Sequence, residues 1–283
     1  MEINKLNNLL ELFYRQYLKE KPDQIFLKSL KNPESQFTWK ETYLNILKLS
    51  QELNLYINKK DRCLLISENR PEWMIADLAI MLADGITVPA YTTYVERDYE
   101  YLIDDCKPSI VIISNDIQYN KIKDIIKSKT FIKKILSFEE IKYASDVACI
   151  KNIFKKKEYQ EKNFLNLEIA RNDLACIIYT SGTQGNPKGV MLSHGGILSN
   201  CEGALFLLKE FISKKAKFLT WLPLSHSYEH TVQFVQIALG ARVFYAESID
   251  KLIKNMSECN PDIMTAVPRF YQNLYQKINA SFN

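Results

Sequence analysis

The sequence predicts an α/β protein built from two stacked βαβ lobes with mostly parallel sheets. Short apolar runs alternate with helical segments of about ten to fifteen residues, which is typical of βαβ units. The alternation occurs twice, and a charged stretch without a clear period, residues 151–172, separates the two blocks. We therefore expect a first lobe with N-terminal helices over residues 1–160 and a second lobe over residues 161–283.

The first fifty residues are expected to form two helices with a short strand between them. Apolar residues recur at three- and four-residue spacing from Leu6 to Tyr17, as on one face of a helix. Residues 25–27 form an apolar run after a Pro-Asp pair and are expected to be a strand. Thr38 and Glu41 have the spacing of a capping box, so a second helix should begin after Thr38.

The first alternating block begins at Arg62. Pro71 stands where proline is favoured, at the first position of a helix, and Gly85 is expected to end that helix. We expect strands at 63–66, 86–89, 110–113 and 135–136, and helices at 72–82, 97–106 and 117–126.

The second alternating block contains a glycine-rich loop, which is expected to follow a strand and to lead into a helix. We expect strands at 175–179, 218–221, 242–245 and 263–267, and helices at 195–211, 228–239, 249–256 and 269–278.

Composition excludes several classes of protein. The chain has 283 residues and a formal net charge of +4, which argues against a dedicated nucleic-acid-binding protein. Its six cysteines are scattered without the close spacing of a metal site, so we interpret them as reduced core residues of a cytoplasmic protein. The N-terminus lacks the apolar run of a secretory signal, and no run of about 18 apolar residues predicts a membrane span.

The glycine-rich loop is the most informative feature of the sequence. Five of the eight glycines lie between Gly182 and Gly196, and the loop also holds Lys188 and three hydroxyl residues, Thr180, Ser181 and Thr183. Glycines let backbone N–H groups approach an anion, hydroxyls donate hydrogen bonds and lysine adds charge, so we expect a phosphate-binding loop. The Walker pattern fails because Gly189 follows the lysine where a hydroxyl residue is needed, and the dinucleotide fingerprint is absent. A glycine-rich hairpin without a ligand is the plain structural alternative.

The motif resembles the signature loop of the adenylate-forming enzymes. The matching residues are Tyr179-Thr180-Ser181-Gly182-Thr183-Gln184-Gly185-Asn186-Pro187-Lys188-Gly189-Val190, followed by Ser193-His194. Three further passages are similar to the long-chain fatty acid–CoA ligase branch: Ile66–Trp73, Leu222–Glu229 and Ala266–Phe270. Gln184 and Gly196 depart from the usual residues of the family.

The resemblance implies an ATP-dependent, AMP-forming acid–thiol ligase. Such enzymes join a carboxylate to ATP, release pyrophosphate and transfer the acyl group to CoA, so ATP, Mg²⁺ and CoA are the implied cofactors. The implied phosphate-binding residues are Thr180, Ser181, Gly182, Thr183, Gln184, Gly185 and Lys188. Thr183 is also the implied magnesium ligand, and His226 is the implied catalytic residue beside the α-phosphate.

Other residues in the matching passages are interpreted mainly as structural. His194 is expected to cap or pack a helix, and Glu68, Arg70 and Trp73 are expected to fix the edge of a sheet. Two aromatic residues, Trp221 and Tyr228, are candidates for the wall of an acyl tunnel, although core packing is the commoner role for such residues. His230 is assigned no role.

The resemblance also implies an incomplete enzyme. The adenine-binding and ribose-binding motifs of the family and its mobile C-terminal domain have no counterpart in this sequence. We therefore expect an incomplete N-terminal domain that is inactive alone. The alternatives are a non-catalytic nucleotide-binding remnant, half of a split enzyme, or adenylation of another carboxylic acid. A fatty acid is the implied substrate; the partners compatible with the family are a second copy, a complementing C-terminal chain, or the inner face of a membrane through peripheral contact.

Overall fold

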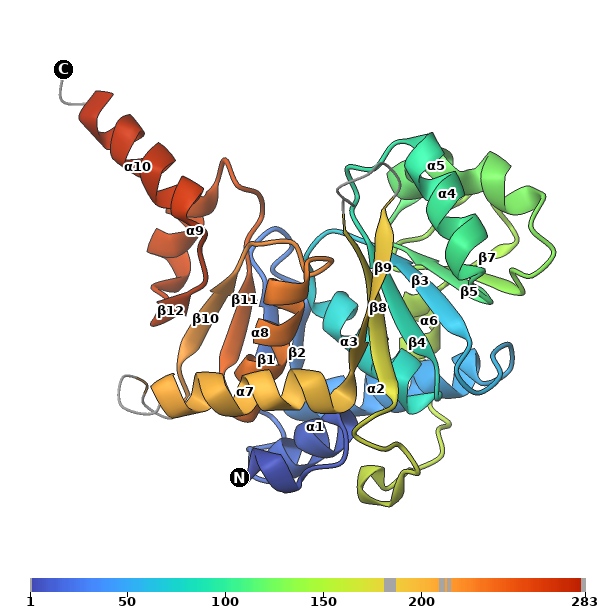
Figure 1. The fold of residues 1–283 in the computed structure, drawn as a ribbon, viewed down its shortest axis with the longest axis horizontal. Helices are drawn as coiled ribbons and strands as arrows, with labels where there is room; N and C mark the ends of the chain where they lie inside the picture. The colour runs from blue at the N-terminus through green and yellow to red at the C-terminus, as the bar shows by residue number, and fades with distance from the viewer. Residues whose placement is uncertain (1, 181–186, 209–211, 213–214, 281–283) are drawn as a thin grey trace.

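The computed structural model describes residues 2–180, 187–208, 212 and 215–280 (Figure 1). These residues form two β-sheets with helices between and around them, so the predicted α/β class is confirmed. One sheet has seven described strands in the order β7-β6-β5-β3-β4-β8-β9. The other has five described strands in the order β12-β10-β11-β1-β2. Neighbouring strands are parallel except at two antiparallel pairs, β1 with β2 and β8 with β9.

Strands from both sides of residue 160 enter each sheet. The pair β1 and β2 joins the five-stranded sheet because β1 runs beside β11, with Leu27 opposite Val243. The pair β8 and β9 joins the seven-stranded sheet through the β4–β8 pairing. The strands are β1 (Ile25–Ser29), β2 (Gln36–Thr38), β3 (Arg62–Ile66), β4 (Ile86–Ala90), β5 (Ile110–Ile113), β6 (Lys134–Ser137), β7 (Val147–Cys149), β8 (Leu174–Thr180), β9 (Lys188–Ser193), β10 (Lys217–Thr220), β11 (Arg242–Tyr245) and β12 (Ile263–Met264).

Most helices begin where the sequence signals predict. Thr38 caps α2, and its hydroxyl accepts from the N–H of Glu41 at 3.1 Å while the Glu41 carboxylate accepts from the N–H of Thr38 at 2.8 Å. Pro71 is the first residue of α3. The helices are α1 (Leu9–Tyr17), α2 (Trp39–Leu53), α3 (Pro71–Leu82), α4 (Glu96–Cys106), α5 (Asp116–Lys127), α6 (Ile150–Phe154), α7 (His194–Leu208), α8 (Ser227–Ala238), α9 (Leu252–Cys259) and α10 (Pro268–Ala280).

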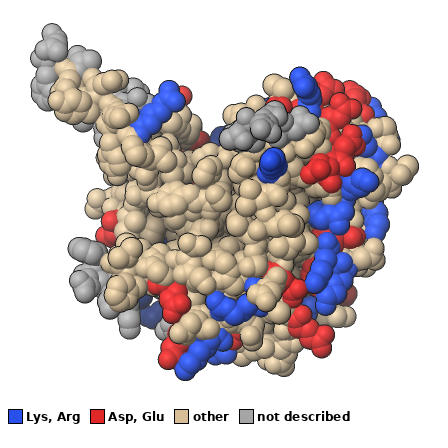
Figure 2. All heavy atoms as spheres, viewed as in Figure 1, with Lys and Arg blue, Asp and Glu red and all other residues tan. Residues whose placement is uncertain are grey.

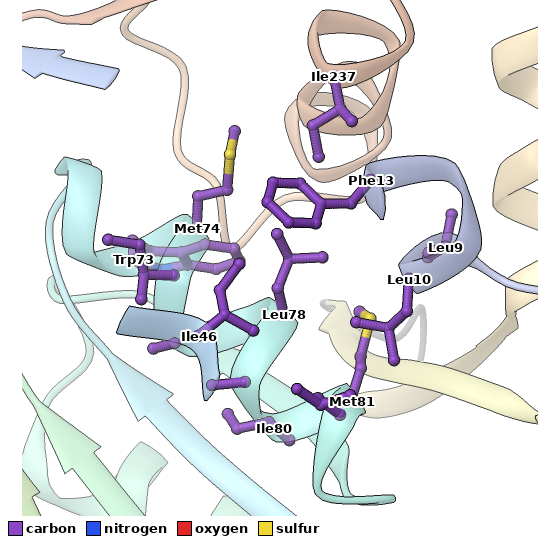
Figure 3. Packing of buried hydrophobic residues seen from close by; sticks show 14 of the residues in the cluster. Leu9, Leu10, Phe13, Ile46, Trp73, Met74, Leu78, Ile80, Met81 and Ile237 are labelled. Atoms are coloured by element: carbon purple, nitrogen blue, oxygen red, sulfur yellow. The ribbon is translucent and has the colours of Figure 1, made fainter. Parts of the chain in front are cut away.

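Helix α3 lies between the two sheets and is the centre of the hydrophobic core. Every residue of α3 is buried, and the helix contacts β4 of one sheet and β1 of the other. Figure 3 shows Phe13 of α1 next to Leu78 of α3, with Ile237 of α8 on the other side of the Phe13 ring. A helix that is almost entirely apolar is expected only where it is covered on every side, which explains why Asp77, an acid in the middle of this helix, needs a buried partner.

The surface over α7 carries few charges, whereas charged residues gather over the opposite part of the same face (Figure 2). Glu202 is the single Asp, Glu, Lys or Arg in α7. In the described part of the chain, no helix has the length and apolar character needed to cross a lipid bilayer.

Candidate functional site

The glycine-rich loop joins the two strands of a β-hairpin. The sequence predicted that the loop leads directly into a helix, but β9 lies between the loop and α7. Thr180 at the end of β8 stands opposite Lys188 at the start of β9. The intervening candidates Ser181, Gly182, Thr183, Gln184 and Gly185 lie outside the described residues.

Helix α4 holds both strands at the base of this loop. The Tyr101 hydroxyl donates to the carbonyl of Pro187 at 3.1 Å, and the Tyr179 hydroxyl is hydrogen-bonded to Asp105. Gly189 lets β9 approach β8 closely, because a Cβ at this position would lie 2.9 Å from Cγ2 of Ile177. The two ends of the loop are therefore fixed against the sheet by contacts from a separate helix.

Thr180 and Lys188 are both exposed at the mouth of the hairpin. Among the described residues, Lys188 forms no ion pair. The loop follows the carboxyl end of β8, and in open α/β sheets ligands bind at the carboxyl ends of the parallel strands. The surface is hollowed between this end of the molecule and α10 (Figure 2).

His226 lies in the turn that follows β10 of the five-stranded sheet. Its backbone N–H donates to the carbonyl of Pro223 at 2.9 Å. Its side chain is exposed and caps α8, with Nδ1 accepting from the N–H of Tyr228 at 3.2 Å. The cap fixes one ring nitrogen and leaves Nε2 as the polar atom that can meet a ligand.

Direct hydrogen bonds connect the passages that resemble the ligase family, or the residues next to them. The Asn69 side chain bonds to the backbone of Leu222 and Leu224. The Thr265 hydroxyl donates to Oε2 of Glu229 at 2.6 Å, and the Trp221 indole N–H donates to the carbonyl of Thr265 at 2.6 Å. Segments far apart in the sequence therefore meet where β3, β10 and β12 end.

Glu229 is buried in α8, and among the described residues one of its carboxyl oxygens has no hydrogen-bond partner. Burial raises the pKa of Glu229 to about 7, although the hydrogen bond from Thr265 acts in the opposite direction. In the described part of the chain, neither Oε1 of Glu229 nor the buried hydroxyl of Tyr245 has a hydrogen-bond partner. A carboxyl group in this environment holds its proton to a higher pH than one in water.

His230, one turn after His226, forms the buried partner that Asp77 requires. Its Nε2 lies 3.0 Å from Oδ2 of Asp77, and Nε2 of Gln233 donates to the same oxygen at 2.9 Å. Burial alone lowers the pKa of His230, but Cys176 and the Asp77 carboxylate raise it to about 10. The pair fixes α8 to α3, and the Trp73 ring packs edge-on against the imidazole at 5.3 Å between centroids.

The sequence interpretation gave His230 no role. The available signal was Asp77, an acid in the middle of the most apolar helix, because such a group is rarely buried without a partner. The sequence does not say which partner it has, since 153 positions separate the two residues.

Three other residues of the matching passages, His194, Arg70 and Glu68, are buried or are paired with other side chains of the protein. His194 is buried at the start of α7, and burial lowers its pKa to about 4. Arg70 is paired with Glu72 at 3.0 Å and with Glu139 at 2.9 Å. Glu68 accepts from the Gln118 side chain at 3.0 Å. None of the described residues form a cluster of His, Cys, Asp or Glu that could hold a metal ion, and the magnesium candidate Thr183 lies outside them.

The fold and the hairpin define an α/β protein with a glycine-rich hairpin at the carboxyl edge of a sheet. The family model for the AMP-binding enzymes matches residues 14–282, so the chain belongs to the AMP-binding enzyme family.

Individual relatives agree with this assignment. The chain is 29% identical over 252 residues to long chain acyl-CoA synthetase 3 of Arabidopsis thaliana, covering 84% of this chain and 38% of that protein. It is 30% identical over 236 residues to fatty acyl-CoA synthetase A of Dictyostelium discoideum, covering 80% of this chain and 35% of the relative. Among solved structures, ATP-bound MatB of Rhodopseudomonas palustris is similar with a TM-score of 0.74 and 23% identity, covering 95% of this chain and 51% of that one. The chain thus spans little more than a third of the curated relatives.

Proposed function

We propose that this chain is the N-terminal portion of a long-chain fatty acid–CoA ligase that uses ATP to activate a carboxylate as an acyl-adenylate and then transfers the acyl group to CoA. The observation that carries the proposal is the signature motif on the β8–β9 hairpin, with Thr180 and Lys188 facing each other at its mouth. The names of the two curated relatives support an acyl-CoA synthetase. ATP-bound MatB supports ATP as the nucleotide.

On this proposal, the hairpin binds the phosphate end of ATP. Thr180 would donate a hydrogen bond to a phosphate oxygen, and Lys188 would add a charge-assisted contact worth about 1.5–3 kcal/mol. When bound, ATP would supply the leaving pyrophosphate and Mg²⁺ would neutralise part of its charge. The exposed position of both side chains fits a polyanionic ligand, as does the lack of an ion pair at Lys188 among the described residues.

His226 would meet the reacting carboxylate and α-phosphate through Nε2. Its Nδ1 is engaged by the N-terminus of α8, so the ring is oriented before a ligand arrives. Orientation and electrostatic stabilisation are the main protein contributions in displacements at phosphorus. In this scheme the imidazole holds a defined position and donates or accepts one hydrogen bond there.

Lys188→Ala tests the nucleotide part of the proposal. Titration of the 283-residue chain with Mg-ATP should show affinity weakened about 10–100-fold by this substitution, because one charge-assisted contact is lost. Lys157→Ala is the matched control, since Lys157 is also exposed and lies outside the hairpin. Equal ATP affinity in Lys188→Ala and the unsubstituted chain would contradict a phosphate-binding role.

Fatty-acid-dependent pyrophosphate exchange tests the catalytic part. We propose that the chain alone does not form acyl-adenylate, because the family's adenine-binding and ribose-binding motifs are not among its residues. Exchange above the background without fatty acid would overturn that statement. Exchange that appears when a polypeptide with the missing motifs is added would support the proposed reaction.

A further inference from the structure

Asn69 joins the two sheets at the edge where the candidate site lies. Its amide nitrogen donates to the carbonyl of Leu222 at 2.6 Å, and its amide oxygen accepts from the N–H of Leu224 at 3.0 Å. Asn69 follows β3 of the seven-stranded sheet, whereas Leu222 follows β10 of the five-stranded sheet. One side chain therefore forms two hydrogen bonds that connect the ends of two strands from different sheets.

Both bonds hold the turn that carries His226. Pro223 lies between the two bonded residues, and its carbonyl accepts the backbone N–H of His226 at 2.9 Å. The imidazole then caps α8 through Nδ1. A shift of residues 222–224 would therefore move the backbone of His226 and the ring attached to it.

The chemistry of the turn requires an amide at position 69. The two bonded groups are an acceptor, the carbonyl of Leu222, and a donor, the N–H of Leu224, so one orientation of the Asn69 amide satisfies both. A carboxylate of the same shape can accept from Leu224 but cannot donate to Leu222. Aspartate at this position would instead place a carboxylate oxygen where the Asn69 amide nitrogen lies, 2.6 Å from the carbonyl oxygen of Leu222. The two oxygens would repel each other.

The position of Asn69 relative to the phosphate loop is also fixed by the sheet. Strand β3 pairs with β4, and β4 pairs with β8, which ends at Thr180. These strands are parallel, so Asn69 and the hairpin follow carboxyl ends at the same edge. The hydrogen bonds of Asn69 thus tie the His226 turn to the sheet that carries the loop.

We propose that Asn69 is a positioning residue, which fixes the turn 222–226 and, through it, the imidazole of His226 against the sheet that carries the phosphate loop. Only the claim that this position of the imidazole matters for catalysis rests on the proposed function. The geometry itself can be tested without nucleotide, fatty acid or CoA.

The test uses NMR spectra of the 283-residue chain labelled at histidine. The chain has three histidines, and His226→Gln identifies the ring signals of His226 by their loss. In Asn69→Asp and Asn69→Ala, the His226 ring signals should shift or broaden, while those of buried His194 and His230 keep their positions. Asn69→Asp preserves the side-chain shape, so it decides the question if Asn69→Ala does not fold.

Asn115→Ala is the matched control, since Asn115 also bonds a backbone N–H, that of Gln118 at 3.2 Å, but caps a different helix, α5. It should leave the His226 signals unchanged. Unchanged His226 signals in Asn69→Asp would overturn the proposal. Equal shifts of all three histidines would also overturn it, because they would show a general loosening of the fold.

A kinetic measurement separates this proposal from the proposed function. In an enzyme completed with the missing motifs, Asn69→Asp should lower kcat for adenylation by up to about 100-fold with little change in KM for ATP, because misplacement of about 1 Å can have this effect. Absence of activity in the unsubstituted completed enzyme would reject the proposed function and leave the NMR result standing. A rise in KM for ATP with unchanged kcat would contradict positioning through His226.

Discussion

Glu229→Gln should remove a pH dependence of stability that originates in one buried carboxyl group. Burial raises the pKa of Glu229 from an ordinary value of 4.5 to about 7 in the folded protein. The unfolded chain releases this proton above pH 4.5, whereas the folded chain retains it until about pH 7. The folded state is therefore progressively disfavoured between these values. At 1.36 kcal/mol for each unit, the full penalty above pH 7 is about 3 kcal/mol.

Urea unfolding at pH 5 and pH 8 measures this effect. Glutamine cannot ionise, and its amide oxygen can still accept the Thr265 hydroxyl. The free energy of unfolding of Glu229→Gln, relative to the unsubstituted chain, should therefore rise by about 2–3 kcal/mol from pH 5 to pH 8. The other titrating groups are the same in both proteins, so their contributions to the free energy of unfolding cancel in this difference.

Glu258→Gln is the control for the loss of a surface carboxylate. The Glu258 side chain is 43% exposed and pairs with Lys254 at 3.5 Å, so its replacement should change stability by less than about 1 kcal/mol at either pH. If the stabilities of Glu229→Gln and the unsubstituted chain keep a constant difference from pH 5 to pH 8, the reasoning on Glu229 is refuted.

Four further predictions concern stability and accessibility. Asp77→Ala should lower the free energy of unfolding by about 3–5 kcal/mol, because His230 would stay buried without its carboxylate; a urea-measured loss below 1 kcal/mol would contradict the pairing. Gly189→Ala should lower Tm, because its Cβ meets a side chain of β8 at 2.9 Å. Gly203→Ala, with nothing within 4 Å of its Cβ and a helical backbone, should raise stability by about 0.5–1 kcal/mol. Cys149 should react first with a thiol reagent, because the other five cysteines are buried; a second thiol reacting at the same rate in the folded protein would disprove this.

Local signals in the sequence predicted most elements of the fold. The hydroxyl and glutamate spacing at Thr38 and the proline at position 71 gave the starts of α2 and α3, because caps depend on neighbouring residues only. Strands β2 and β7 were missed because three residues are too short to show a period. Strand β9 was missed because Lys188 and Gly189 were interpreted as part of the loop.

The pairing of strands could not be predicted from alternation. An apolar run identifies a strand but carries no information about its neighbour, and the partner of β1 lies more than two hundred residues away. The same limit applies to the site. The motif named Thr180 and Lys188 as phosphate-binding candidates, and the hairpin places these two residues opposite each other. The partners of Asn69, Asp77 and Glu229 instead depend on contacts between distant segments.

The pairing of β1 with β11 sets an order of events during synthesis. The ribosome completes Ser29 long before Arg242, the first residue of β11. At about 5–20 residues per second, β1 waits about 10–40 s for this neighbour. During that interval the edge of β1 that later pairs with β11 has unpaired backbone groups, which other chains or chaperones that bind extended segments can reach. The five-stranded sheet is therefore the part of this fold that cannot close until most of the chain has left the ribosome.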